Sequence, residues 1–157
     1  MNFPLFLNHQ NQRIMRRISI LILLVIAASV SYAQNNPISK KKFHFGAEQD
    51  TAGGYTQAIL VDNIIYVSGT VALEVTPQSI KQVYKVIEKS LEPFGATLQN
   101  VVKETILTTD IEAMKRYNAV RKEVYKGDYP ASSWMQVSRL FMHEARLEIE
   151  VIAHLKK

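Results

Sequence analysis

The C-terminal part of the chain has the most regular alternation of hydrophobic and polar residues. Between positions 147 and 153 every second residue is apolar. Successive side chains of a β-strand point to opposite faces, so this alternation predicts a strand with one apolar face. The opposite face is expected to carry three charged residues: Arg146, Glu148 and Glu150.

A spacing of three to four residues between apolar positions predicts two helices. The apolar face of the first helix extends from Ile80 to Phe94. Thr76 is expected to be its N-cap, Pro77 its first residue and Gly95 the residue that ends it. Asp110 is expected to cap a second, continuous helix that ends at Gly127. Its apolar stripe comprises Ala113, Tyr117, Val120 and Val124.

Short β-branched or aromatic segments before, between and after these helices predict the strands. They lie at residues 43–45, 56–61, 64–67, 101–108, 134–137 and 147–153, and Asp62-Asn63 forms a two-residue hairpin turn. The order β-β-β-α-β-α-β-β predicts a single α+β domain, with both helices on one face of the sheet. The other face needs a cover that the chain does not supply, which favours an oligomer.

The first 33 residues have the pattern of a signal peptide. Arg13, Arg16 and Arg17 precede a 13-residue apolar stretch that ends before Ser31-Tyr32-Ala33. An uncleaved membrane anchor or a buried helix is the alternative interpretation, although a membrane-spanning helix needs about 20 residues. Cleavage before Gln34 would leave a polar tail at 34–42 and a domain at 43–157, without a membrane span. It would place the protein in the periplasm or outside the cell.

The composition excludes several classes of site. The 157 residues contain no cysteine, so a disulfide framework, a Cys-ligated metal centre and a thiol nucleophile are excluded. Beyond residue 33 there are 16 basic and 14 acidic residues, a net charge of +2, which does not indicate a nucleic-acid partner. The histidines lack metal-ligand spacing, so no metal site is predicted.

Glu148 and Glu150 are the strongest candidates for chemistry that the pattern alone provides. Both lie on the polar face of the last predicted strand. If that face borders a subunit interface, a partly dry cleft would raise the pKa of a carboxyl group and suit it to general acid or base catalysis. If the face is exposed to water, both are ordinary solvated carboxylates, which pattern alone favours.

Several short motifs, in a fixed order, resemble the RidA (YjgF) family of reactive-imine deaminases. They are Gly54–Ala58, Tyr66–Gly69, Phe94–Ala96, Val101–Thr105, Tyr117–Val120, Pro130–Ser133 and Glu148–Ala153. The resemblance covers essentially all of residues 44–155. The resemblance implies a chorismate-mutase-like fold that assembles as a homotrimer, with ligand clefts between the subunits.

The same resemblance implies hydrolysis of 2-imino acids to 2-oxo acids and ammonia, without a cofactor. In that mechanism an Arg holds the substrate carboxylate and a Glu positions the attacking water. Glu148 resembles this Glu. Three further residues resemble substrate-binding residues of the family cleft: Tyr55, Ser68 and Asn118.

Ser132 occupies the position of the family's carboxylate-binding Arg, and Pro130-Ala131 before it keeps the family spacing. We therefore assign Ser132 to the catalytic and substrate-binding residues. Losing the charged fork forfeits roughly 2–3 kcal/mol of carboxylate binding, about 30- to 150-fold. One extra residue falls in the loop at 141–145, and the loop from Thr70 to Pro77 is shortened.

Two functions fit these features. The first is an exported hydrolase that deaminates a small reactive imine or enamine lacking the usual carboxylate. The alternative is a non-catalytic trimeric protein of the same fold that binds a small molecule. The endoribonuclease activity sometimes attached to the family is not supported, because the charge is low and no basic–aromatic stripe occurs.

Overall fold

The computed structural model describes residues 9–33 and 37–156, in two compact units, Met1–Ile38 and Ser39–Lys157. The first unit contains helix α1, His9–Ala33. Within the described ranges, no helix combines the length and the apolar character needed to cross a membrane. Gln34, the predicted first residue after cleavage, lies outside the described residues, so the signal peptide stays a prediction.

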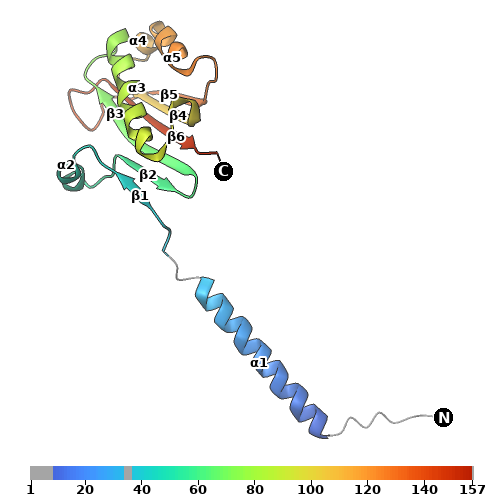
Figure 1. Cartoon of the computed structure of the whole chain (residues 1–157). Coiled ribbons are helices and arrows are strands. Elements are labelled where there is room, and N and C mark those ends of the chain that lie inside the picture. Colours follow the sequence, from blue (N-terminus) through green and yellow to red (C-terminus); the bar gives the residue numbers. More distant parts are fainter. Residues whose placement is uncertain (1–8, 34–36, 157) are drawn as a thin grey trace. The chain divides into compact units, whose positions relative to one another are not determined.

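The second unit is built on a six-stranded sheet with the order β1-β2-β3-β6-β4-β5 (Figure 1). Neighbouring strands are antiparallel, except that β4 and β5 run parallel. The strands are β1 Lys41–Phe43, β2 Ala58–Val61, β3 Ile64–Ala72, β4 Val101–Thr108, β5 Ala131–Gln136 and β6 Leu147–His154. The sheet is therefore mixed, and β5 lies at one edge.

Helix α3, Pro77–Leu91, begins at the predicted cap, but its α-helical part ends three residues before Phe94. The Thr76 hydroxyl accepts a hydrogen bond from the Ser79 backbone N–H at 3.2 Å, and Pro77 follows in the first turn. The chain continues through a 3₁₀ turn, Glu92–Phe94, to Gly95, whose φ of 74° lies in the left-handed region. That region favours glycine, which explains why the helical segment stops there.

The core lies between the helices and one face of the sheet. On β6 the four apolar residues predicted to share a face are at most 2% exposed: Leu147, Ile149, Val151 and Ala153. Ile80, Ile87 and Leu91 of α3 are fully buried in the same cluster. The predicted α+β domain, with helices packed against a mixed sheet, is confirmed.

Several details differ from the prediction. Strand β1 begins at Lys41 where the predicted strand began at residue 43, and β5 begins at Ala131 where the predicted strand began at residue 134. The second helix is divided at Tyr117 into α4, Ile111–Arg116, and α5, Asn118–Tyr125, because the backbone at Tyr117 leaves the helical region (φ −97°, ψ 13°). The short helix α2, Ala47–Ala52, had no apolar periodicity to indicate it. Strand β3 continues beyond Val67 through an irregularity in its pairing with β6, where Ser68-Gly69 resembled a strand end.

Candidate functional site

A cavity of about 560 Å³ lies where β3 and β6 meet the chain around α2 and the loop after β5. Three of the predicted site residues line it together, namely Tyr55, Ser68 and Glu148. The other lining residues are Gln49, Gly53, Gly69, Val71, Phe141 and Met142. The cavity is within the size range of small-molecule sites, and it combines a few polar groups with apolar walls.

Glu148 reaches this cavity by lying across Gly69. The two residues are on neighbouring strands, at the place where the β3–β6 register shifts between Val67 and Thr70. A Cβ atom added to Gly69 would overlap Oε1 of Glu148. Only glycine leaves room for the carboxylate here, so the shape of β3 determines where the carboxylate of β6 sits.

The environment of Glu148 favours its protonated form. Partial burial raises the pKa of its carboxyl group, and the nearby charge of Glu150 raises it further. Desolvation and a like charge both disfavour the ionised carboxylate. Glu148 can therefore exchange a proton closer to neutral pH than an exposed glutamate can, as a general acid or base requires.

Tyr55 is held at the mouth of the cavity by the turn that follows α2. Gly54 takes a left-handed conformation there, with φ of 73°, and the Tyr55 backbone N–H donates to the Asp50 carbonyl at 3.0 Å. The side chain of Asp50 raises the pKa of the Tyr55 hydroxyl, with a smaller contribution from burial. The phenol therefore stays protonated, and its hydroxyl oxygen can accept a hydrogen bond from a ligand.

Asp50 is a buried carboxylate that the sequence did not indicate. Its Oδ2 atom lies 2.9 Å from Nδ1 of His44. His44 precedes Gly46 and Asp50 belongs to α2, so this contact fixes the position of α2. No short motif links these two residues. Their pairing depends on the tertiary placement of α2, which sequence periodicity did not predict.

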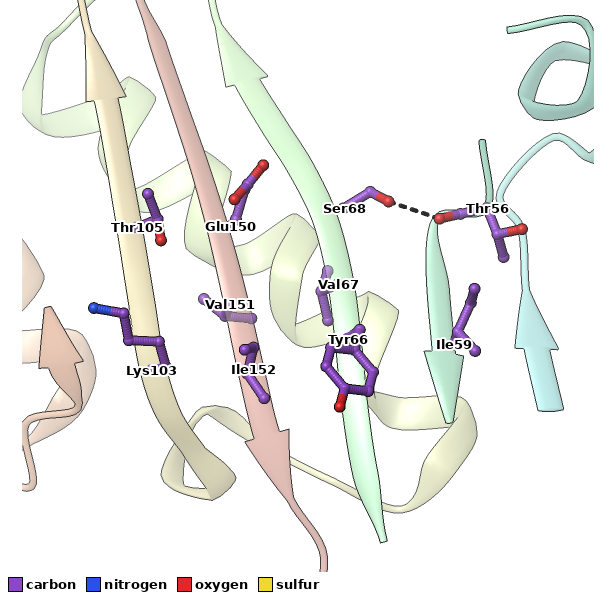
Figure 2. Close-up of a pocket in the computed structure, with 10 residues that line it drawn as sticks. All are labelled: Thr56, Ile59, Tyr66, Val67, Ser68, Lys103, Thr105, Glu150, Val151 and Ile152. Carbon is purple, nitrogen blue, oxygen red and sulfur yellow. Dashed lines mark hydrogen bonds between the residues drawn. The ribbon is translucent and has the colours of Figure 1, made fainter. Parts of the chain in front are cut away.

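Ser68 lies between two hollows of the surface. Its hydroxyl donates to the Thr56 carbonyl at 2.7 Å, as Figure 2 shows, which leaves its lone pairs free to accept. The second hollow, of about 290 Å³, also borders Tyr66, Lys103 and Glu150. Figure 2 shows these side chains on neighbouring strands. The larger cavity brings together Tyr55, Ser68 and Glu148, whereas the smaller hollow has only Ser68 and Glu150 of the predicted candidates, so we place the candidate reaction centre in the larger cavity.

Asn118 and Ser132 do not line the cavity that contains Glu148. Asn118 begins α5, and its Oδ1 atom is buried without a hydrogen-bond partner among the described residues. Ser132 lies on the edge strand β5 and faces the helix side of the sheet. A single chain therefore separates the five predicted site residues into two groups.

The Ser132 hydroxyl belongs to a hydrogen-bond network around a buried carboxylate, that of Glu104. Oε1 of Glu104 accepts from Ser132 Oγ at 2.7 Å and from Arg121 Nε at 2.7 Å. Oε2 accepts from the hydroxyls of Tyr84 at 2.6 Å and Tyr125 at 2.9 Å. Glu104 is 0% exposed, so these four donors replace the water that its charge would otherwise bind.

Aromatic rings complete the network around Arg121. Its guanidinium carbon lies 5.2, 5.9 and 5.7 Å from the ring centres of Tyr125, Tyr129 and Trp134. The Trp134 indole N–H also donates to Ser132 Oγ at 2.7 Å. Ser132 thus both donates and accepts within the protein, which leaves it no proton to donate to a ligand in this arrangement.

No group of three or more His, Cys, Asp or Glu residues suited to a metal ion occurs in the described part of the chain. The two carboxylates differ in their surroundings. Glu148 lines the cavity, whereas Glu104 is buried among its four donors. The chemistry that the cavity itself supports is proton transfer by Glu148.

Comparison with known proteins identifies relatives of the chain. A family model described as Endoribonuclease L-PSP matches residues 45–155. A human 2-iminobutanoate/2-iminopropanoate deaminase is 34% identical over 110 residues, which cover 64% of this chain and 80% of the human protein. The corresponding rat protein is 36% identical over the same length and coverage.

Solved structures show the same fold. A member of the YjgF/YER057c/UK114 family from Mycobacterium tuberculosis is 27% identical, with a TM-score of 0.68, and the match covers 74% of this chain and 100% of that chain. The Rid-family protein YyfA from Yersinia pestis is 31% identical, with a TM-score of 0.65 and the same coverage of both chains.

The contact between Gly69 and Glu148 predicts a specific steric effect. Gly69→Ala should destabilise the protein by about 1–3 kcal/mol, because the added methyl group displaces the carboxylate. Urea unfolding should show that the cost falls to less than half when Glu148→Ala is also present. Gly46→Ala is the matched control, since its nearest atom would be 3.8 Å away. Equal costs of Gly69→Ala in both backgrounds would contradict the contact.

The Glu104 network predicts a second, larger effect. Arg121→Met leaves a buried charge without its cation and should lower the free energy of unfolding by about 3–5 kcal/mol. The control is Lys115→Met, which removes the exposed ion pair with Glu112 and should change stability by less than about 1 kcal/mol. Urea unfolding measures both. Losses of similar size in the two variants would show that the buried pair has no special role.

Proposed function

The chain belongs to the RidA (YjgF) family of imine deaminases, and we propose that it hydrolyses a small reactive imine or enamine that lacks a carboxylate group. The observation that carries this proposal is the lining of the Glu148 cavity. Among the described residues that line it, Glu148 is the one with a charged side chain. A carboxylate without a nearby cation repels an anionic ligand and favours a neutral or cationic one.

In the proposed reaction, Glu148 acts first as a base and then as an acid. Its carboxylate takes a proton from water as the water oxygen bonds to the imine carbon, and the imine nitrogen takes a proton from the solvent. In the resulting carbinolamine, the protonated Glu148 gives its proton to the nitrogen. The C–N bond then breaks as the hydroxyl proton is released to the solvent, giving a carbonyl compound and ammonia. Its raised pKa suits Glu148 to both steps.

The remaining site residues have supporting roles in this proposal. The hydroxyl oxygens of Tyr55 and Ser68 each accept a hydrogen bond from the substrate or from the water. We assign Asn118 and Ser132 to the same cleft across a subunit boundary, because one chain keeps them apart from Glu148.

This arrangement needs an oligomer, and we propose a homotrimer. The sheet face around the smaller hollow bears Ile59, Tyr66 and Ile152, and Tyr66 is exposed in the single chain (Figure 2). An apolar face of this kind is typical of a subunit interface. Light scattering should give three times the mass of the mature chain, and a monomer at micromolar concentration would contradict the shared cleft.

We further propose that the protein is exported to the periplasm or beyond the cell. Arg13, Arg16, Arg17 and the apolar stretch after them support a cleaved signal at 1–33. The mature protein isolated from its host should begin at Gln34, and an intact mass that includes residues 1–33 would contradict export.

The pH dependence of the reaction tests the role of Glu148. The base form is the deprotonated one, so kcat/KM should increase as pH rises through the raised pKa of Glu148. Glu150→Gln removes a like charge, lowers that pKa and should move the increase to lower pH. Ammonia release from a freshly generated carboxylate-free imine, such as the imine of butanone, measures this.

Two variants complete that experiment. Glu148→Gln should lower kcat by about 10²- to 10⁴-fold, whereas Glu144→Gln, in the exposed loop before β6, should leave the profile unchanged. A wild-type protein that is folded but releases no ammonia above the uncatalysed rate would favour the alternative, a non-catalytic binding protein.

The residue at position 132 should determine whether a carboxylate-bearing imine is accepted. Ser132→Arg restores a guanidinium and should raise kcat/KM for 2-iminobutanoate by about 10- to 100-fold. Ser133→Arg is the matched control, because Ser133 faces the other side of β5, where its hydroxyl accepts from Lys103 Nζ at 2.7 Å. Adding Glu148→Gln should abolish the gain. If wild type already matches Ser132→Arg, the substrate carboxylate binds elsewhere.

A further inference from the structure

The loop between β5 and β6 presents an aromatic side chain at the edge of the Glu148 cavity. Leu140 and Ala145 are buried and fix the two ends of this loop, and the Arg146 backbone N–H donates to the Ala72 carbonyl at 2.8 Å. Between these anchors, Phe141 is 96% exposed. Phe141 is therefore exposed to solvent within a loop whose two ends are fixed.

Phe141 is one of four large side chains with apolar surface that surround this cavity. Tyr55, Val71 and Met142 are 43%, 37% and 45% exposed, and all three line it together with Phe141. Single exposed apolar residues are common on protein surfaces, but a group around one cavity is typical of a binding site. The apolar walls are available to a ligand.

The polar groups of the cavity lie on a different part of its lining. Glu148, Gly69 and Ser68 belong to the sheet, where the two strands meet. Phe141 and Met142 belong to the loop. A ligand that fills this space has a polar reacting group at the sheet and a hydrocarbon substituent at the loop. The cavity volume of about 560 Å³ is large enough for more than a short-chain imine.

We propose that Phe141 and Met142 form a hydrophobic subsite that selects carboxylate-free imines with a bulky branched or aromatic substituent. This inference rests on the proposed function for the reaction, but the selectivity itself is a property of binding. The apolar substituent removes Phe141 from water, which gives a favourable contribution that a methyl or ethyl group cannot provide.

Ketone products of the proposed reaction test the subsite without requiring turnover. The full chain should bind 4-phenylbutan-2-one at least about tenfold more tightly than butanone, as measured by calorimetry or ligand-observed NMR. Phe141→Ala should reduce this ratio to about threefold or less, and Met142→Ala should reduce it partly. Leu73→Ala is the matched control, because Leu73 is exposed but does not line the cavity. It should keep the wild-type ratio.

Two results would overturn the assignment: equal affinities for the two ketones in wild type, or an unchanged ratio in Phe141→Ala. If the second result comes with a lower oligomer mass, Phe141 contacts a second copy of the chain instead. The kcat/KM values for the two corresponding imines test the subsite and the reaction separately. Selective ketone binding without imine hydrolysis supports the subsite and contradicts the proposed reaction.

Discussion

The buried carboxylate of Glu104 is the interaction on which the arrangement of the helix side depends. A fully buried charge has a large desolvation cost, which is offset only when several donors surround it. Here the donors come from α3, α5 and the edge strand β5, through Tyr84, Tyr125, Arg121 and Ser132. Removing any one of them leaves the charge less well solvated, so the network holds these elements in one relative position.

This constraint affects the chemistry available at position 132. Its hydroxyl donates to Glu104 and accepts from Trp134, and the nearby Arg121 is itself paired with Glu104. The positive charge of Arg121 is therefore balanced by Glu104 within the protein. At the Glu148 cavity, no described lining residue is cationic. Both observations favour a substrate without a carboxylate, and they arise from opposite faces of the sheet.

The elements with local signals were predicted well from the sequence. The alternation in β6, the Thr76 cap and the left-handed Gly95 each depend on neighbouring residues, and each is present. Glu104 was not singled out, because a single acidic residue in a strand has the same pattern whether it faces water or four donors. The Gly69–Glu148 contact and the presentation of Phe141 depend on strand pairing and loop anchoring, so periodicity carries no information about them. The roles of Tyr55, Ser68, Asn118, Ser132 and Glu148 stay predictions, although the structure brings three of them to one cavity.

Glu148 and Glu104 illustrate opposite uses of a carboxylate in one small sheet. The folded protein raises the pKa of Glu148, so at intermediate pH it binds a proton there more tightly than the unfolded chain does. This linkage favours folding below the ordinary glutamate pKa, and the advantage is lost as pH rises through the raised value. Above the raised pKa, the ionised Glu148 therefore works against folding. Glu104 has its donors supplied by the fold and no opening to a ligand. The same sheet therefore holds a partly buried carboxylate that opens onto a cavity on one face and a carboxylate enclosed by four donors on the other.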